Sequence, residues 1–148
     1  MKQKIIPDII PNQRIRTLPP EHKVFEAAKL MVSHDIGAIV ITSEDGLMAG
    51  IVTERDLTRR VLAKGLDPTK ISVGEIMTRD PDTVSPGDSA LEALEIMRIR
   101  RYRHLPVVED GKVVGMVSVR DLYEVMKEEL EASIRETEAF VFGDRYGA

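Results

Sequence analysis

Residues 50–57 read GIVTERDL, and the same pattern returns at residues 115–122 as GMVSVRDL. An upstream block, TLPPEHKVFEAAKLM at residues 17–31, likewise matches TVSPGDSALEALEIM at residues 83–97. Matching positions lie 66 residues apart in the upstream block and 65 residues apart in the downstream block. Because two blocks recur in the same order at nearly the same distance, the chain is predicted to contain two copies of one structural unit.

Each copy predicts the same order of elements: strand, helix, strand, turn, strand and helix. An Asp-Gly pair follows the apolar runs at residues 38–41 and 105–108, which is a strong hairpin signal. The predicted fold class is α/β, more closely described as α+β, with two pseudo-symmetric repeats. Each repeat is expected to be a small sheet with two helices, and the two are expected to pack into one module. The apolar positions that recur at helical spacing are expected to face the core: Val24, Phe25, Ala28 and Met31, then Ala90, Leu91, Leu94 and Met97.

The rest of the chain is predicted to flank these repeats. The first repeat is expected at residues 13–70 and the second at residues 71–130. Residues 1–12 are expected to form an irregular N-terminal arm, because Pro7 and Pro11 interrupt them.

A long helix is predicted from Leu122 onward, and residues 131–148 are expected to form its end and an apolar tail. An apolar segment left exposed is a site of association, so the chain is expected to form a homodimer through this region. Alternatively, the tail folds back on its own module. The apolar residues of the tail are Phe140, Val141, Phe142 and Tyr146.

The composition excludes several classes of function. A chain of 148 residues with a net charge of −4 is too short for a (β/α)8 barrel, which needs about 250 residues. It has no cysteine, and its histidines (His22, His34 and His104) are far apart, so no metal site is expected. No Walker A loop or nucleophile elbow occurs, so no enzyme activity is expected. The absence of a long apolar run and of a secretory signal predicts no membrane association and a cytoplasmic protein.

The two units resemble the cystathionine β-synthase (CBS) domain. The resemblance rests on the order of elements and on Gly-x-x-Thr/Ser-x-x-Asp at residues 50–56 and 115–121, and it covers roughly residues 13–130. In this family two repeats pack through their sheets, and clefts between them bind adenosine-containing ligands. The resemblance therefore implies a stand-alone regulatory module that binds AMP, ADP or ATP, with S-adenosylmethionine as another candidate and no catalytic cofactor. It further implies a homodimer that signals to an unidentified regulated protein or through self-assembly.

By the same resemblance, each repeat contributes a nucleotide-binding site. In related modules the aspartate accepts hydrogen bonds from the ribose hydroxyls, and a carboxylate suits a cis-diol because it has two acceptor oxygens. The first site is expected to comprise Thr17, Leu18, Ile36, Gly37, Ala38, Thr53, Arg55 and Asp56. The second site is expected to comprise Thr83, Val84, Tyr102, Arg103, His104, Pro106, Ser118, Arg120 and Asp121.

The same motifs have a structural interpretation. Ser/Thr-x-x-Asp at a helix start is also a capping box, and the two roles are compatible. Leu18, Ile36 and Val84 are equally explained as core residues.

Residues 98–104, RIRRYRH, form the densest basic cluster. Arg98 and Arg100 are expected to be solvated, whereas Arg103 and His104 are expected to face phosphate, since a guanidinium binds phosphate in a bidentate manner. The alternative function is a nucleic-acid-binding or purely structural interaction module that uses this cluster. Residues 1–120 carry a net charge of only +1, which makes nucleic acid an unlikely partner.

The two sites are expected to differ. The first repeat has Gly37 and Ala38 where the second has Arg103 and His104. The second site is therefore expected to bind phosphate more tightly than the first.

Overall fold

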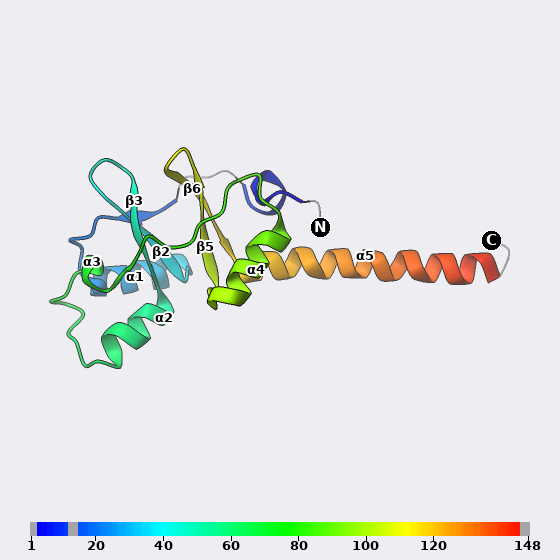
Figure 1. Ribbon diagram of the computed structural model, residues 1–148. Helices are drawn as coiled ribbons and strands as arrows, with labels where there is room; N and C mark the ends of the chain where they lie inside the picture. Colours follow the sequence, from blue (N-terminus) through cyan, green and yellow to red (C-terminus); the bar gives the residue numbers. More distant parts are fainter. Residues whose placement is uncertain (1–2, 12–14, 146–148) are drawn as a thin grey trace.

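The computed structural model describes residues 3–11 and 15–145 (Figure 1). A mixed α+β module holds two small sheets with their helices, and one long helix, α5 (Val119–Arg145), projects from it. The fold class predicted from the internal repeat is thereby confirmed. Among the described residues, no helix combines the length and the apolar character that crossing a membrane requires.

The first repeat forms the larger sheet. β2 and β3 make the predicted hairpin, β1 lies parallel to β2, and the sheet order is β1-β2-β3-β4. The last strand, β4 (Thr78–Arg79), lies in residues 63–82, the segment between the repeats, and pairs antiparallel with β3. The elements of the first repeat are β1 (Thr17–Leu18), α1 (Val24–His34), β2 (Ala38–Thr42), β3 (Met48–Thr53), α2 (Glu54–Asp56) and η2 (Leu57–Leu62).

The second repeat has the same order of elements around a two-stranded sheet. β5 and β6 are antiparallel, and Val84 forms a parallel bridge to Val107 of β5, in the position that β1 occupies in the first repeat. The helices α1 and α4 end alike, at Asp35 and Arg101, two left-handed residues with φ of 51° and 60°. The elements are α4 (Ala90–Arg100), β5 (His104–Glu109), β6 (Lys112–Ser118) and the start of α5. A short helix that precedes β4, α3 (Val73–Ile76), packs in the core of the first repeat.

The residues that α1 and α4 bury in the core are not all the ones predicted from the sequence. Ala27 in α1 and Ala93 in α4 are fully buried, whereas Phe25 is 46% exposed and Leu91 is 51% exposed. These helices approach their sheets closely, and a small side chain at the contact allows that approach.

The N-terminal arm is not merely irregular, because it packs into the second repeat. η1 (Ile5–Ile9) lies beside the start of α5 (Figure 1), and Ile5 and Ile10 belong to the core of the second repeat. The Ile5 N–H donates to the carbonyl of Asp88 at 2.9 Å. A Cβ at Gly115 of β6 would lie 2.9 Å from Ile10 Cδ1, so the arm packs directly over this strand position and a larger residue there would displace the Ile10 side chain.

The segment between the repeats packs on the first repeat in the corresponding way. A Cβ at Gly50 of β3 would lie 2.5 Å from the carbonyl oxygen of Thr78 and 2.7 Å from Met77 Sδ. The stretch of chain before each repeat therefore covers the hairpin of the other repeat. At Gly50 the close approach is to a backbone oxygen, so the contact requires glycine at this position of the repeated block.

The C-terminal helix is longer than the sequence predicts. Phe140 and Val141 lie inside α5, which continues to Arg145, so the expected tail after the helix is helical over these residues. Phe142 is likewise inside the helix, and Tyr146 lies outside the described residues. Over residues 119–141, whose side chains the structure describes, the buried positions of the helix, Leu122 and Val125, lie near its start.

Candidate functional site

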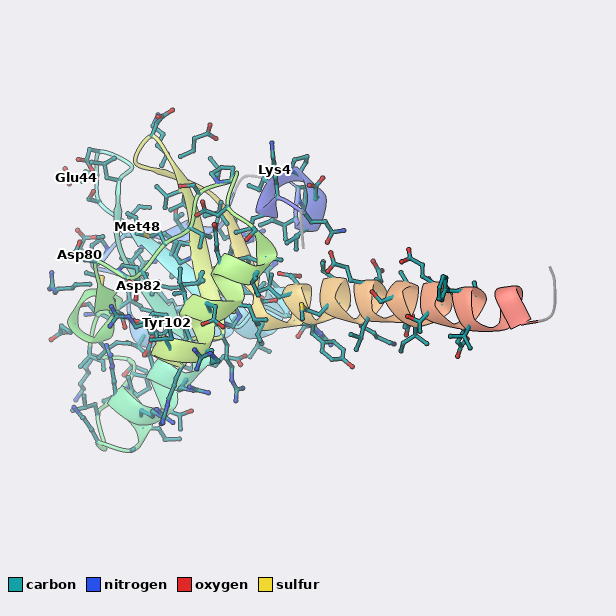
Figure 2. All side chains as sticks on the ribbon, turned by 45° about the vertical axis from the view of Figure 1, so that its right-hand side comes forward. Lys4, Glu44, Met48, Asp80, Asp82 and Tyr102 are labelled. Carbon is teal, nitrogen blue, oxygen red and sulfur yellow. The ribbon has the colours of Figure 1, made fainter. Side chains whose placement is uncertain are left out.

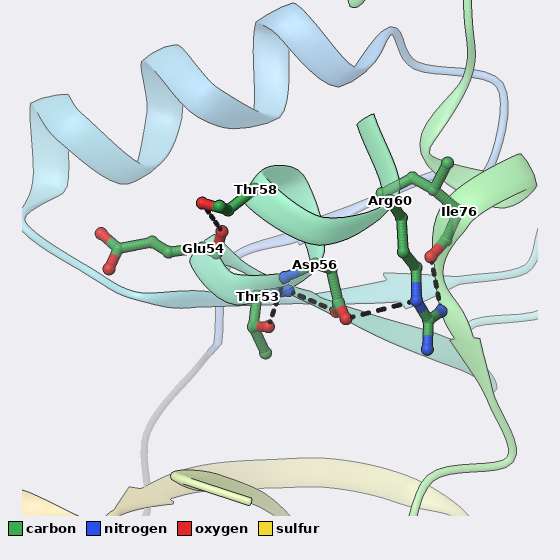
Figure 3. Close-up of polar contacts among 6 residues, drawn as sticks. All are labelled: Thr53, Glu54, Asp56, Thr58, Arg60 and Ile76. Carbon is green, nitrogen blue, oxygen red and sulfur yellow. Dashed lines mark hydrogen bonds and ion pairs between the residues drawn. The ribbon is translucent and has the colours of Figure 1, made fainter. Parts of the chain in front are cut away.

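The first repeated motif forms a complete capping box where β3 meets α2 (Figure 3). The Thr53 N–H donates to Asp56 Oδ2 at 2.9 Å, and the Asp56 N–H donates to Thr53 Oγ1 at 3.2 Å. This arrangement satisfies two amides at the start of the helix. The other carboxylate oxygen, Oδ1, lies 3.7 Å from Arg60 Nε, and the Asp56 side chain is 15% exposed. The capping role thus uses one oxygen and leaves the second for another partner.

The second motif closes in the same way at the start of α5. The Ser118 N–H and hydroxyl donate to Asp121 Oδ2 at 2.8 Å and 2.9 Å, and the Asp121 N–H donates to Ser118 Oγ at 3.2 Å. The structural interpretation of both motifs is therefore confirmed. It does not exclude a ligand, because a carboxylate has acceptor positions beyond those that the cap uses.

A cavity of about 460 Å³ opens beside the first motif, which is within the roughly 300–1,000 Å³ of small-molecule sites. It is lined by α2 and η2 of the first repeat, by the segment between the repeats and by the turn from α4 to β5. Figure 2 labels Asp82 and Tyr102, which reach it from the last two of these segments. The lining residues are Gly37, Ile51, Thr53, Glu54, Arg55, Asp56, Arg59, Arg60, Thr78, Pro81, Asp82, Arg100, Arg101, Tyr102, Arg103 and His104.

This cavity combines residues that the sequence assigned to different sites. Gly37, Thr53, Arg55 and Asp56 of the expected first site line it together with three residues of the expected second site. The three are Tyr102, Arg103 and His104. The expected partition is therefore corrected: the arginine-rich turn of the second repeat faces the Asp56 motif, because the pseudo-symmetric packing brings the end of α4 against α2.

The other predicted site residues do not line this cavity. Ala38, Val84 and Pro106 are buried, while Leu18 and Ile36 pack against the core of the first repeat. For Leu18, Ile36 and Val84 the structure therefore supports the core interpretation. The exposed Thr17, Thr83 and Arg120 and the half-buried Ser118 and Asp121 are also not among the lining residues.

Several lining residues were not predicted. Arg59 and Arg60 follow Asp56 by three and four positions, a spacing that places them on the same side of a helix. Asp82 comes from the segment between the repeats and pairs with Arg100 at 3.2 Å. Arg100, which was expected to be solvated only, is exposed and also lines the cavity. The remaining residues of this set are Ile51, Glu54, Thr78, Pro81 and Arg101.

The basic cluster is divided by the fold. Arg98 points elsewhere and pairs with Glu95 at 2.9 Å, whereas the arginines at 100, 101 and 103 line the cavity. Arg101, in the left-handed conformation, ends α4 and turns the chain. Arg100 before the turn and Arg103 after it therefore both reach the cavity.

His104 lies where the two repeats meet. Its Cε1 is 3.2 Å from the point at which Gly37 would carry a Cβ, so the imidazole packs closely against the Gly37 backbone, and a side chain there would press on it. Burial lowers the pKa of His104 below its ordinary 6.5, although the Glu54 and Asp121 carboxylates oppose this shift. Arg103 lowers the pKa further. The imidazole is therefore neutral at pH 7 and is able to donate one hydrogen bond and accept another.

The CBS domain family matches the chain twice, at residues 6–63 and 73–128. The chain belongs to the CBS domain family, as a protein with a pair of CBS domains. The first match begins at residue 6, inside the N-terminal arm.

Individual relatives agree with this assignment. The mitochondrial CBS domain-containing protein CBSX3 of Arabidopsis thaliana is 35% identical over 81% of this chain and 60% of its own length. The Arabidopsis thaliana protein CBSCBSPB3 is 40% identical over 70% of this chain but only 18% of its own length. The chain thus spans from about a fifth to three fifths of these curated relatives.

Solved structures share the fold. A conserved protein from Pyrococcus horikoshii superposes with a TM-score of 0.76 at 33% identity, covering 85% of this chain and 93% of that one. The CBS domain pair of protein MJ0100 superposes with a TM-score of 0.72 at 28% identity, covering 79% of this chain and 91% of that one. The MJ0100 structure is a complex with 5-methylthioadenosine and S-adenosyl-L-methionine.

Proposed function

We propose that this chain is a regulatory module that binds an adenosine nucleotide in the cavity between its CBS repeats. The observation that carries the proposal is the position of Asp56: one of its oxygens caps α2, and the other lies at an arginine-lined cavity. A ribose diol fits an acceptor of this kind, and the arginines fit phosphate. The adenosine ligands of MJ0100 support the choice of an adenosine compound.

The position of the basic cluster favours this function over nucleic-acid binding. Most of its charged residues face a concave space that is also lined by carboxylates, namely Glu54, Asp56 and Asp82. A duplex backbone is better matched by a convex or extended basic surface without interspersed acids. The expected role as a non-catalytic sensor follows from the family, since such pairs are generally regulatory.

The test is calorimetric titration of the purified chain with adenosine, AMP, ADP and ATP, with guanosine and cytidine nucleotides as controls. A ligand at about 100 times its dissociation constant stabilises the folded protein by about 2.7 kcal/mol. For a chain of this size the melting temperature should rise by roughly 5–11 °C. If no adenosine compound binds up to millimolar concentration, the proposed function is wrong.

We further propose that two copies of the chain associate through α5. Four of its apolar side chains (Tyr123, Leu130, Ile134 and Val141) are each 47% to 65% exposed. At 3.6 residues per turn, these four positions fall within about 40° of one another, so they form one straight stripe. A second copy of the same helix, laid along the stripe, would bury it. The output of the sensor would then act through the relative position of the two modules or on a regulated partner.

A further inference from the structure

The charge of the cavity defines the class of ligand more narrowly than the adenosine assignment does. Six arginines line it, against three carboxylates, and His104 is neutral at pH 7. The cavity therefore has an excess of three positive charges. The six arginines are Arg55, Arg59, Arg60, Arg100, Arg101 and Arg103.

Three of these arginines already have protein partners. Arg55 Nη1 donates to the carbonyl of Arg101 at 3.2 Å, Arg60 Nη1 donates to the carbonyl of Ile76 at 2.8 Å, and Arg100 pairs with Asp82. Within residues 3–11 and 15–145, the guanidinium groups of Arg59, Arg101 and Arg103 make no hydrogen bond or ion pair. These three groups are the ones available to a ligand.

The available arginines come from both repeats. Arg59 belongs to η2 of the first repeat, while Arg101 and Arg103 belong to the turn after α4 in the second. A single phosphate bound beside Asp56 would engage few of these groups. A chain of phosphates is able to reach guanidinium groups from both repeats at once, and each contact is charge-assisted.

We infer that this cavity selects nucleoside di- and triphosphates over the monophosphate, and selects against cationic ligands such as S-adenosylmethionine. The inference rests on the proposed function of the same cavity and concerns the part of the ligand beyond the ribose. A diphosphate carries roughly three negative charges at pH 7 and a triphosphate roughly four, which matches the excess positive charge of the lining. A sulfonium ligand adds positive charge to a cavity that already has an excess of it. In binding a polyphosphate, the cavity would hold the two repeats together.

The experiment is a calorimetric series at fixed ionic strength without divalent metal: adenosine, AMP, ADP, ATP, S-adenosylmethionine and inorganic tripolyphosphate. We expect affinity to rise with each phosphate, by at least about tenfold from AMP to ATP, since one hydrogen bond between charged groups is worth this factor. S-adenosylmethionine should bind more weakly than ATP. The affinity for ATP should also fall more steeply with added salt than the affinity for adenosine.

Two variants and one control locate the effect. Arg59→Gln and Arg101→Gln remove one available guanidinium from each repeat, and each should weaken ATP binding about tenfold while leaving adenosine binding unchanged. The control is Arg98→Gln in α4. Arg98 pairs with Glu95 and does not line the cavity, so its loss should leave ATP binding unchanged. Equal melting temperatures of the three unliganded variants would show that none has lost its fold.

The outcomes separate this inference from the proposed function. Equal affinities for AMP and ATP, with adenosine still bound, would overturn the polyphosphate preference and keep the adenosine site. S-adenosylmethionine binding more tightly than ATP would do the same. Tripolyphosphate binding as tightly as ATP would keep the polyphosphate preference and overturn the adenosine assignment. Failure of every adenosine compound and of tripolyphosphate to bind would overturn both.

Discussion

Arg55 in the first repeat donates a hydrogen bond through Nη1 to the backbone carbonyl of Arg101 in the second repeat, at 3.2 Å. The bond joins the residue that precedes Asp56 in the first motif to the residue that ends α4. Because it uses a backbone oxygen, it constrains the position of the turn and leaves the Arg101 guanidinium to other partners. A ligand in this cavity therefore contacts two repeats that are already connected at its edge.

The two aspartates should separate ligand binding from helix capping. Asp56→Ala and Asp121→Ala each remove the acidic partner of a capping box, so each should destabilise the protein by about 1 kcal/mol. Only Asp56 lines the arginine-rich cavity, so only Asp56→Ala should weaken AMP binding, by about 10- to 150-fold. Titration well below the melting temperature measures this difference. Equal losses of affinity in both variants would contradict the assignment of the cavity as the main site.

The N-terminal arm should stabilise the second repeat. The Ile5 side chain is fully buried, so Ile5→Ala should lower the free energy of unfolding by about 2–5 kcal/mol. Ile99→Ala, on the outside of α4 at 65% exposure, is the matched control and should change it by less than about 0.5 kcal/mol. Urea unfolding followed by circular dichroism measures both. Similar small effects would mean that the arm is not part of the core in solution.

Stability should fall at mildly acidic pH through His104. Its pKa is lowered by folding, so the unfolded chain binds a proton that the folded protein does not. Stability is unaffected well above pH 6.5, falls as pH drops below 6.5, and levels off below the folded pKa. His104→Gln should lose this part of the pH dependence between pH 7.5 and pH 5, whereas His34→Gln, on the exposed end of α1, should keep it. Melting curves across this range test the prediction, which fails when all three proteins have parallel pH profiles.

The stripe on α5 should control the oligomeric state. Leu130→Glu places a charge in the stripe and should convert the expected dimer to a monomer, because a buried unpaired charge is costly. Ala139→Glu makes the same charge change on the opposite side of the helix and should leave the dimer intact. Light scattering over a range of protein concentrations distinguishes the two. A monomeric parent chain, or a dimer that tolerates Leu130→Glu, would refute association through this stripe.

The sequence by itself determined the features that depend on neighbouring residues. The double hairpin follows from Asp-Gly turns between apolar runs, and both capping boxes follow from a hydroxyl residue three positions before an aspartate. The repetition of these signals at a nearly constant offset was sufficient to predict the pair of repeats. Each of these features is decided within a few residues, so the sequence contains all the information that they need.

Only the tertiary structure determined which residues of the two repeats face one another. The sequence placed Arg103 with Asp121 because both belong to the second repeat, but the packing of the repeats places Arg103 in the cavity with Asp56. The same kind of contact buries Ile5 in the distant second repeat. It also selects Ala27 over Phe25 for the core face of α1. Periodicity identifies the sides of a helix or strand, whereas the partner of each side depends on how whole elements fit together in space, and that is not encoded at any fixed spacing in the chain.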